Sequence, residues 1–172
     1  IEMLEEAINE KKGIIKPERK EMVKANVQVD SYIPEVFAPD DFDKISMYQT
    51  IDRIESQEEL RAYEEQILDE FGQLPKTVKV LFEKKRLEIL INSEDVEKYR
   101  ELKGQIEITF SKMFSAHVDG VKLFEILTSI SKDITLRYTD QKIIVKLPQT
   151  NDGLKMAIEV LMRSKEAKKN EN

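Results

Sequence analysis

The sequence has no cysteine and only one histidine, His117. Without cysteine the chain has no disulfide, no thiolate nucleophile and no sulfur-ligated zinc site. Its five glycines stand apart from one another, so they do not form the clustered loop that holds a nucleotide's phosphates. No motif near His117 supplies a second catalytic group, and we interpret it as a residue at the start of a helix. The sequence predicts no catalytic site, no metal site and no cofactor.

Long hydrophobic runs are also missing. No stretch approaches the ~20 consecutive apolar residues that a membrane-spanning helix requires. The first residues, IEMLEEAINEKK, are amphipathic and acidic, whereas a secretory signal begins with basic residues and continues with an apolar run. Together with the missing cysteines, this pattern predicts a cytoplasmic protein that does not contact a membrane.

Charge is abundant, but it is not basic. The chain has 34 acidic and 28 basic residues, a net charge of -6 and a pI near 5.1. Nucleic-acid-binding domains carry a basic footprint, because much of their affinity comes from neutralising phosphates. Two modestly basic stretches, 84–86 and 165–169, are interpreted here as solvated faces. The charge balance argues against a domain that binds nucleic acid.

The first half of the chain has helical patterns. Alternating small apolar residues over 23–29 predict one edge strand, and three helices are expected after it. Their expected inward-facing residues are Phe42, Ile45, Tyr48, Ile51 and Ile54 in the first helix, Leu60, Tyr63, Ile67 and Phe71 in the second, and Val78, Leu81, Phe82, Leu87, Ile89 and Leu90 in the third. The third helix is apolar on more than one side, so we expect it to be the central one.

Cap residues mark where these helices begin and end. Asp40 or Asp41 can cap the first helix, and Ser56-Gln57-Glu58-Glu59 has the spacing of a capping box at the start of the second. Gly72 can adopt the left-handed conformation that ends a helix, and Pro75 is typical of the start of the next one.

The second half returns to strand patterns. Strands are expected over 105–110, 134–138 and 143–147, and residues 97–102 can pair with the first of these through a Lys103-Gly104 turn. Two helices interleave with the strands. Their expected apolar residues are Val118, Val121, Phe124, Leu127 and Ile130 in one, and Leu154, Ala157, Ile158 and Leu161 in the other. The tail, 165–172, has no apolar anchor and is expected to be disordered.

These patterns predict an α+β domain that covers residues 1–172. Its first sub-module, 1–92, consists of three packed helices plus an edge strand. Its second, 93–164, is a small antiparallel sheet with two helices. The 172 residues fit one ordinary domain, and a hydrophobic content of 40% is sufficient for a packed core.

Acidic residues are concentrated in one segment. Between Ile51 and Pro75 there are eight acids and two arginines, so this segment alone carries the net charge of -6. At 100° per residue, Glu58, Glu65 and Asp69 fall within ~20° of one line, opposite the apolar stripe of their helix. Such a ridge can receive arginines from a partner protein; the alternative is an ordinary solvated face. The candidate partner-binding residues are Glu58, Glu65, Gln66, Asp69 and Glu70.

Four stretches of sequence carry a resemblance. They are MLEEAI at 3–8, VQVDSYIPEVFAPD at 27–40, KISMYQTI at 44–51 and ELRAYEEQILDEFGQLP at 59–75. Together they resemble the carboxy-terminal (TRCF) domain of bacterial transcription-repair coupling factors, the Mfd family. The spaced motifs D-x-Y-I-P and D-x-F-G-x-L-P make the resemblance specific over roughly the first half of the chain. Beyond Asn92 the similarity lies only in the order of strands and helices.

The resemblance implies a role that composition does not. Proteins of this family are ATP-driven DNA translocases that displace stalled RNA polymerase from duplex DNA and recruit the excision-repair protein UvrA. Their motor modules precede this segment, which is therefore expected to be a non-catalytic regulatory domain. In the family it packs on the UvrB-like amino-terminal module of the same protein, hides the UvrA-binding surface and restrains the motor.

Glu65 and Asp69 of the acidic ridge lie in the most family-like stretch, 59–75, and Glu58 directly precedes it, so the ridge is the expected docking face. The alternative function is an accessory domain through which the translocase contacts nucleic acid.

Overall fold

The computed structural model describes residues 25, 31–38, 40–150 and 152–169. The first half of the described chain contains the helices α2 (Asp41–Arg53), α3 (Gln57–Phe71) and α4 (Lys76–Ile91). The second half contains β1 (Val96–Leu102), β2 (Gln105–Phe110), α5 (Lys112–Ala116), α6 (Gly120–Ile130), β3 (Thr135–Thr139), β4 (Lys142–Pro148), α7 (Gly153–Ser164) and the short 3-10 helix η1 (Lys165–Ala167). The predicted α+β class is confirmed. The strand expected over 23–29 lies outside the described residues, apart from Ala25, which is not in a strand.

The four strands form one antiparallel sheet in the order β1-β2-β4-β3. Ile106 of β2 lies opposite Leu147 of β4, and Ile108 lies opposite Val145. All four side chains are buried, because alternate residues of a strand point to the same face of the sheet. The other face is polar: Glu107 of β2 pairs with Arg100 at 3.7 Å and with Lys146 at 3.9 Å.

Tight turns connect the paired strands where the sequence predicts them. Gly104 between β1 and β2 has a φ of 73°. Asp140 and Gln141, between β3 and β4, have φ values of 54° and 65°, as a two-residue type I′ turn requires. Both predicted pairings are therefore confirmed, with boundaries within about one residue of the predicted ones.

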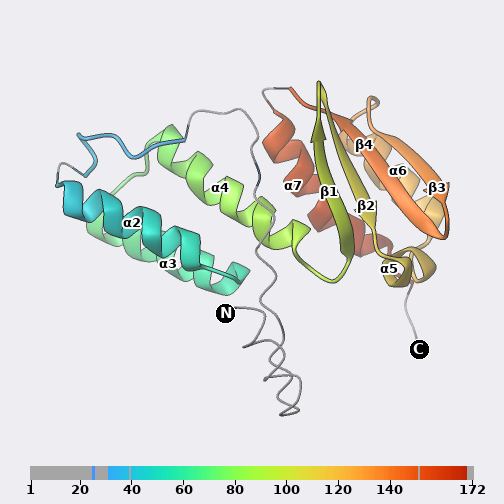
Figure 1. Ribbon diagram of the computed structural model, residues 1–172, viewed down its shortest axis with the longest axis horizontal. Coiled ribbons are helices and arrows are strands. Elements are labelled where there is room, and N and C mark those ends of the chain that lie inside the picture. The colour runs from blue at the N-terminus through green and yellow to red at the C-terminus, as the bar shows by residue number, and fades with distance from the viewer. Residues whose placement is uncertain (1–24, 26–30, 39, 151, 170–172) are drawn as a thin grey trace, which may run out of the picture.

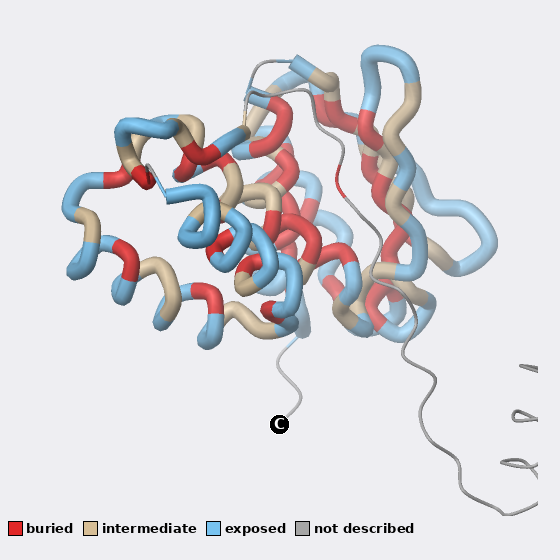
Figure 2. Tube along the Cα trace, turned by 60° about the vertical axis from the view of Figure 1, so that its left-hand side comes forward, coloured by how far each residue is buried: buried red, intermediate tan, exposed pale blue. Residues whose placement is uncertain are grey.

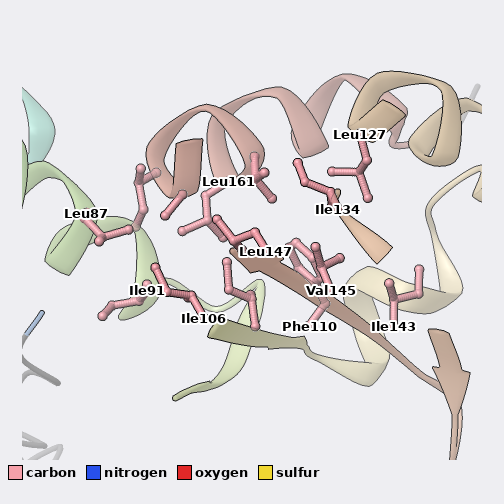
Figure 3. Close-up of a cluster of buried hydrophobic side chains, with 14 of the residues drawn as sticks. Leu87, Ile91, Ile106, Phe110, Leu127, Ile134, Ile143, Val145, Leu147 and Leu161 are labelled. Atoms are coloured by element: carbon pink, nitrogen blue, oxygen red, sulfur yellow. The ribbon is translucent and has the colours of Figure 1, made fainter. Parts of the chain in front are cut away.

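Helix α4 lies between the helical half and the sheet half, as Figure 1 shows. Val78 and Phe82 belong to a core formed with α2 and α3. Leu87 and Ile91 belong to a second core formed with the sheet, α6 and α7. In Figure 3 these two side chains point toward Ile106 of β2 and the other labelled core residues. The prediction that this helix is apolar on more than one side is confirmed, because each side faces a different core.

Two predicted helical stripes are wrong in detail. In the first, Ile51 and Ile54 are buried as predicted, and so is Met47, which the stripe does not include. Phe42 is 75% exposed and Ile45 56% exposed. Figure 2 shows buried and exposed positions alternating turn by turn along the helices. A residue every three positions advances 300° per step, so a long run of that spacing spreads around the helix instead of following one face. The buried face alternates steps of three and four.

The same error occurs in α6. Leu127 of the predicted stripe is buried, but Val121 and Phe124 are exposed, and the buried Leu123 and Ile126 are not in the predicted stripe. Val118, another predicted member, is buried but precedes the helix.

The expectation of a disordered tail is wrong for residues 165–169. Ala167 is fully buried. Its carbonyl oxygen accepts a hydrogen bond from Asp119 N at 2.8 Å, and Lys169 N donates to His117 O at 2.7 Å. The small Ala167 side chain is sufficient to hold the tail, because backbone hydrogen bonds at residues 167 and 169 also join the tail to the segment before α6. Residues 170–172 lie outside the described residues.

Candidate docking surface

Helix α3 presents the candidate residues, and its own sequence fixes where it begins and ends. Ser56 Oγ accepts a hydrogen bond from Glu59 N at 3.1 Å, which confirms the predicted cap. Gly72 ends the helix with a φ of 83°, in the left-handed region that favours glycine. The predicted apolar stripe is confirmed as well: Leu60 and Ile67 are buried, and Tyr63 and Phe71 pack against them.

Aromatic contacts hold the inner face of α3 against its neighbours. The Tyr63 ring lies 6.1 Å from that of Phe82 on α4, centroid to centroid, and the Phe71 ring lies 5.1 Å from that of Phe37. Burial raises the pKa of Tyr63; a hydrogen bond with Thr50 lowers it, and the negative charge of Glu70 raises it. The inner face is therefore committed to the core and unavailable to a partner.

The structure places all five candidate residues on the exposed surface of α3. Glu58, Glu65 and Asp69 lie along the outermost line of the helix, and we call these three the acidic ridge. By the 100° step, Gln66 and Glu70 lie roughly 80–120° further round, on the flank nearer Tyr63. The structure thus brings three of the five onto one line and leaves the other two at its side.

The ridge acids are not neutralised within the part of the chain that the structure describes. None of Glu58, Glu65 and Asp69 forms an ion pair with another described residue. Glu64 of the same helix does: its Oε2 lies 3.4 Å from Arg86 Nη2 on α4. Helix α3 therefore uses one carboxylate to join its neighbour, whereas the three ridge carboxylates have no ion-pair partner in the described ranges.

His117 and Asp40 each make a local structural contact. His117 ends α5 instead of starting a helix, and its Nδ1 lies 2.8 Å from Met113 O. Asp40 caps α2 by accepting a hydrogen bond from Phe42 N at 2.9 Å. Among the described residues, no cluster of three histidine or carboxylate side chains is placed to hold a metal ion. None of the helices in the described ranges is long and apolar enough to cross a bilayer.

Sequence reasoning missed a second charged surface. The two basic stretches interpreted as solvated faces meet in space, because Arg86 of α4 and Lys165 of η1 line the same cavity. Arg61 of α3 lines it too. Lys85 is 3% exposed, so its interpretation as part of a solvated face is wrong. The sequence shows both basic stretches, but they are about 80 positions apart. Nothing in the sequence indicates that the fold brings them together.

Comparison with known proteins shows which family this sequence and fold belong to. The TRCF domain family matches residues 27–121. The transcription-repair-coupling factor of Bacillus subtilis (strain 168) is 32% identical over 146 residues, covering 85% of this chain and 12% of the relative. That of Borreliella burgdorferi is 29% identical over 142 residues, covering 83% of this chain and 12% of the relative. The chain spans about an eighth of the length of these relatives.

A solved structure has the same fold. A crystal structure of the C-terminal domain of transcription-repair coupling factor is similar with a TM-score of 0.58 and 22% sequence identity. The similarity covers 83% of this chain and 92% of the other. The family match and the Bacillus relative lead to one conclusion: the chain belongs to the TRCF domain family of transcription-repair coupling factors.

Proposed function

We propose that this chain is a non-catalytic regulatory domain of a DNA-translocating transcription-repair coupling factor in the cytoplasm. Through the acidic ridge it docks on the UvrB-like amino-terminal module of the same protein. Docking masks the surface that binds UvrA and restrains the ATP-driven motor until RNA polymerase is engaged on duplex DNA. The proposal rests on the family and on the ridge taken together.

The observation that carries the proposal is that the two faces of α3 have different surroundings. Its inner face packs in the core, and Glu64 pairs with Arg86, yet Glu58, Glu65 and Asp69 point outward without a pairing cation among the described residues. Uncompensated charges of one sign repel each other and are screened only by solvent and salt. Arginines or lysines of a facing module would convert that repulsion into charge-assisted hydrogen bonds.

A polar face also suits a contact that must be released. Within one polypeptide, tethering supplies a high effective concentration, so the intrinsic affinity can be low. Interfaces between domains of one chain are more polar than permanent interfaces, and salt-sensitive pairs open without exposing apolar surface. A contact made by the acidic ridge would form because the two modules are tethered, and it would be released when another binding partner competes for the same surface.

Charge reversal in the full-length protein tests the proposal. Glu65→Arg with Asp69→Arg replaces two attractions with two repulsions and leaves the buried residues of α3 unchanged. We expect polymerase-independent ATPase activity and UvrA binding to rise together, to the level reached by deleting the domain. The matched control is Glu125→Arg with Asp133→Arg, which makes the same charge change at exposed positions outside α3. A folded ridge variant that behaves like the parent would place the docking face elsewhere.

The alternative, a nucleic-acid-contacting accessory domain, makes a different prediction for the isolated chain. Phosphate contacts give an affinity for duplex DNA that falls steeply with salt. With a net charge of -6, we expect no binding of duplex DNA at physiological salt and no ATPase activity in a pure sample. A salt-dependent gel shift would support the alternative.

A further inference from the structure

A groove runs over the junction of the two halves, between α3, α4 and α7. It joins two cavities, of about 160 Å³ and about 340 Å³, that share Arg86 of α4 and Met162 of α7. The smaller cavity extends to Arg61 near the start of α3 and to Lys165 of η1. The larger extends along α7 as far as Lys155. The groove reaches α3 at Arg61, and none of the three acidic-ridge residues lines either cavity.

The rim of this groove is basic, although the chain as a whole is acidic. The smaller cavity has three cationic side chains and no acid: Arg61, Arg86 and Lys165. The larger adds Lys155 and Arg163 together with two acids, Glu83 and Glu159. Two more carboxylates pair with the groove's arginines from outside its lining: Glu64 with Arg86, and Glu166 with Arg163 at 3.9 Å. Counted with them, the groove has five cations and four acids, a small positive excess within a chain of net charge -6.

Part of this positive charge is free to act on a ligand. Arg86 is paired with Glu64, and Arg163 lies 3.6 Å from Glu159. Arg61, Lys155 and Lys165 form no ion pair with any described residue. Three cations that have no ion-pair partner in the part of the chain the structure describes favour an anionic ligand at this groove.

The floor of the groove is apolar. Leu90 of α4 is buried beneath it, and Ile158 of α7 is half-buried. Met162 is 52% exposed and is common to both cavities. Methionine adapts its shape to different apolar partners because its side chain is unbranched and polarizable. An apolar floor inside a basic rim calls for a ligand that carries both carboxylates and an apolar side chain.

We propose that this groove binds an acidic segment of another polypeptide, which places an apolar side chain on Met162 and its carboxylates against Arg61, Lys155 and Lys165. Charge complementarity identifies the occupant. A nucleic acid fits less well, because Glu83 and Glu159 would repel a continuous run of phosphates, and the floor offers no aromatic ring on which a base can stack. The groove and the acidic ridge are opposite in sign, so the domain has two docking surfaces for two different partners.

Methyl NMR with synthetic peptides tests this proposal on the whole chain. The probe is the peptide EEELEELEEE, compared with EEESEESEEE, which keeps the charge without the leucines, and SSSLSSLSSS, which keeps the leucines without the charge. Carbon-13 labelling of the methionine methyl groups reports directly on Met162. Met113 of α5 is 54% exposed, close to the 52% of Met162, and serves as the reference resonance away from the groove. We expect the first peptide to shift Met162, to leave Met113 unchanged and to bind more tightly than either comparison peptide.

A double charge reversal in the groove and a matched control outside it test whether the groove's cations bind the peptide. Arg61→Glu with Lys165→Glu should weaken binding of EEELEELEEE about tenfold or more, a change of about 1.4 kcal/mol. Lys112→Glu with Lys132→Glu, which makes the same charge change at exposed sites outside the groove, should leave Kd unchanged. Failure of the peptide to shift Met162, or equal binding by both variants, would overturn the proposal. Tighter binding of single-stranded oligothymidylate with a shift of Met162 would assign the groove to nucleic acid instead.

Discussion

Lys85 and Glu88 form a buried ion pair one turn apart on α4, with Lys85 Nζ 3.7 Å from Glu88 Oε2. Each also bonds to a different segment of the chain. Lys85 Nζ donates to Asp52 O at 2.9 Å, in the last turn of α2, and Glu88 Oε1 accepts from Ala25 N at 3.2 Å. The pair therefore ties α2 and the residue at position 25 to the central helix.

Removing one partner of this pair should be strongly destabilising. Lys85→Met leaves the Glu88 carboxylate buried without its cation, which we expect to lower the free energy of unfolding by about 3–5 kcal/mol. The double variant Lys85→Met with Glu88→Leu removes both charges and should recover much of that loss. Denaturant titration measures both values. Simple additivity of Lys85→Met and Glu88→Leu would show that the two side chains do not interact.

The caps of α3 give a second prediction. Ser56→Ala removes the acceptor for Glu59 N and should cost about 0.5–2 kcal/mol. Gly72→Val should cost more, because a β-branched residue is strained at a φ of 83°, even though an added Cβ would meet no atom within 4 Å. Gly120→Ala is the control: the space around it is also open and its φ is ordinary, so stability should stay level or rise. Unchanged denaturant midpoints for both α3 variants would contradict this account of the helix ends.

The ordered tail can be tested by truncation. Ending the chain after Ser164 removes the buried Ala167 and the backbone hydrogen bonds to Asp119 and His117, and should cost roughly 2–3 kcal/mol. It also removes Lys168, whose Nζ lies 3.2 Å from Asp95 Oδ2. Ending the chain after Lys169 should leave the melting temperature unchanged. Equal melting temperatures for the two truncations would show that the tail contributes nothing to stability.

Tyr99 of β1 predicts sensitivity to alkali. Burial raises its pKa well above the ordinary value of 10.0, as does its hydrogen bond to Glu101, 2.7 Å away. At pH values above 10 the unfolded chain therefore loses a proton that the folded chain keeps, so stability should fall as pH rises through this range. Tyr99→Phe removes that proton, and its unfolding free energy should fall less steeply from pH 9 upward. Parallel pH profiles for the parent and Tyr99→Phe would contradict the assignment.

Local signals in the sequence predict local structure well in this chain. The Ser56 cap, the Gly72 stop and the turn at Asp140-Gln141 each depend on a few neighbouring residues, and all three are confirmed. Helix faces depend on the period over several turns. The run of three-residue spacings from Phe42 onward predicts a single apolar face, but a run of that spacing spreads around the helix.

Features that depend on tertiary contacts were not predictable in the same way. The tail is ordered because residues before α6 bond to Ala167 and Lys169, and no pattern within 165–172 indicates those partners. The basic groove forms because α4 and α7 pack side by side and bring Arg86 near Lys165. The acidic ridge was predictable as a surface, because it needs only the helical period and one confirmed stripe. The partner surface of the ridge lies on another module, so this sequence does not indicate it.

The docking claim is tested most directly by titrating this chain against the separately prepared UvrB-like amino-terminal module in a calorimeter. We predict binding that weakens as salt is raised, since exposed charges are screened over about 10 Å at 0.1 M ionic strength. Glu65→Arg with Asp69→Arg should weaken it about tenfold or more, whereas Glu125→Arg with Asp133→Arg should bind like the parent. A folded Glu65→Arg, Asp69→Arg variant that binds as tightly as the parent at low salt would contradict the assignment of the acidic ridge as the docking face.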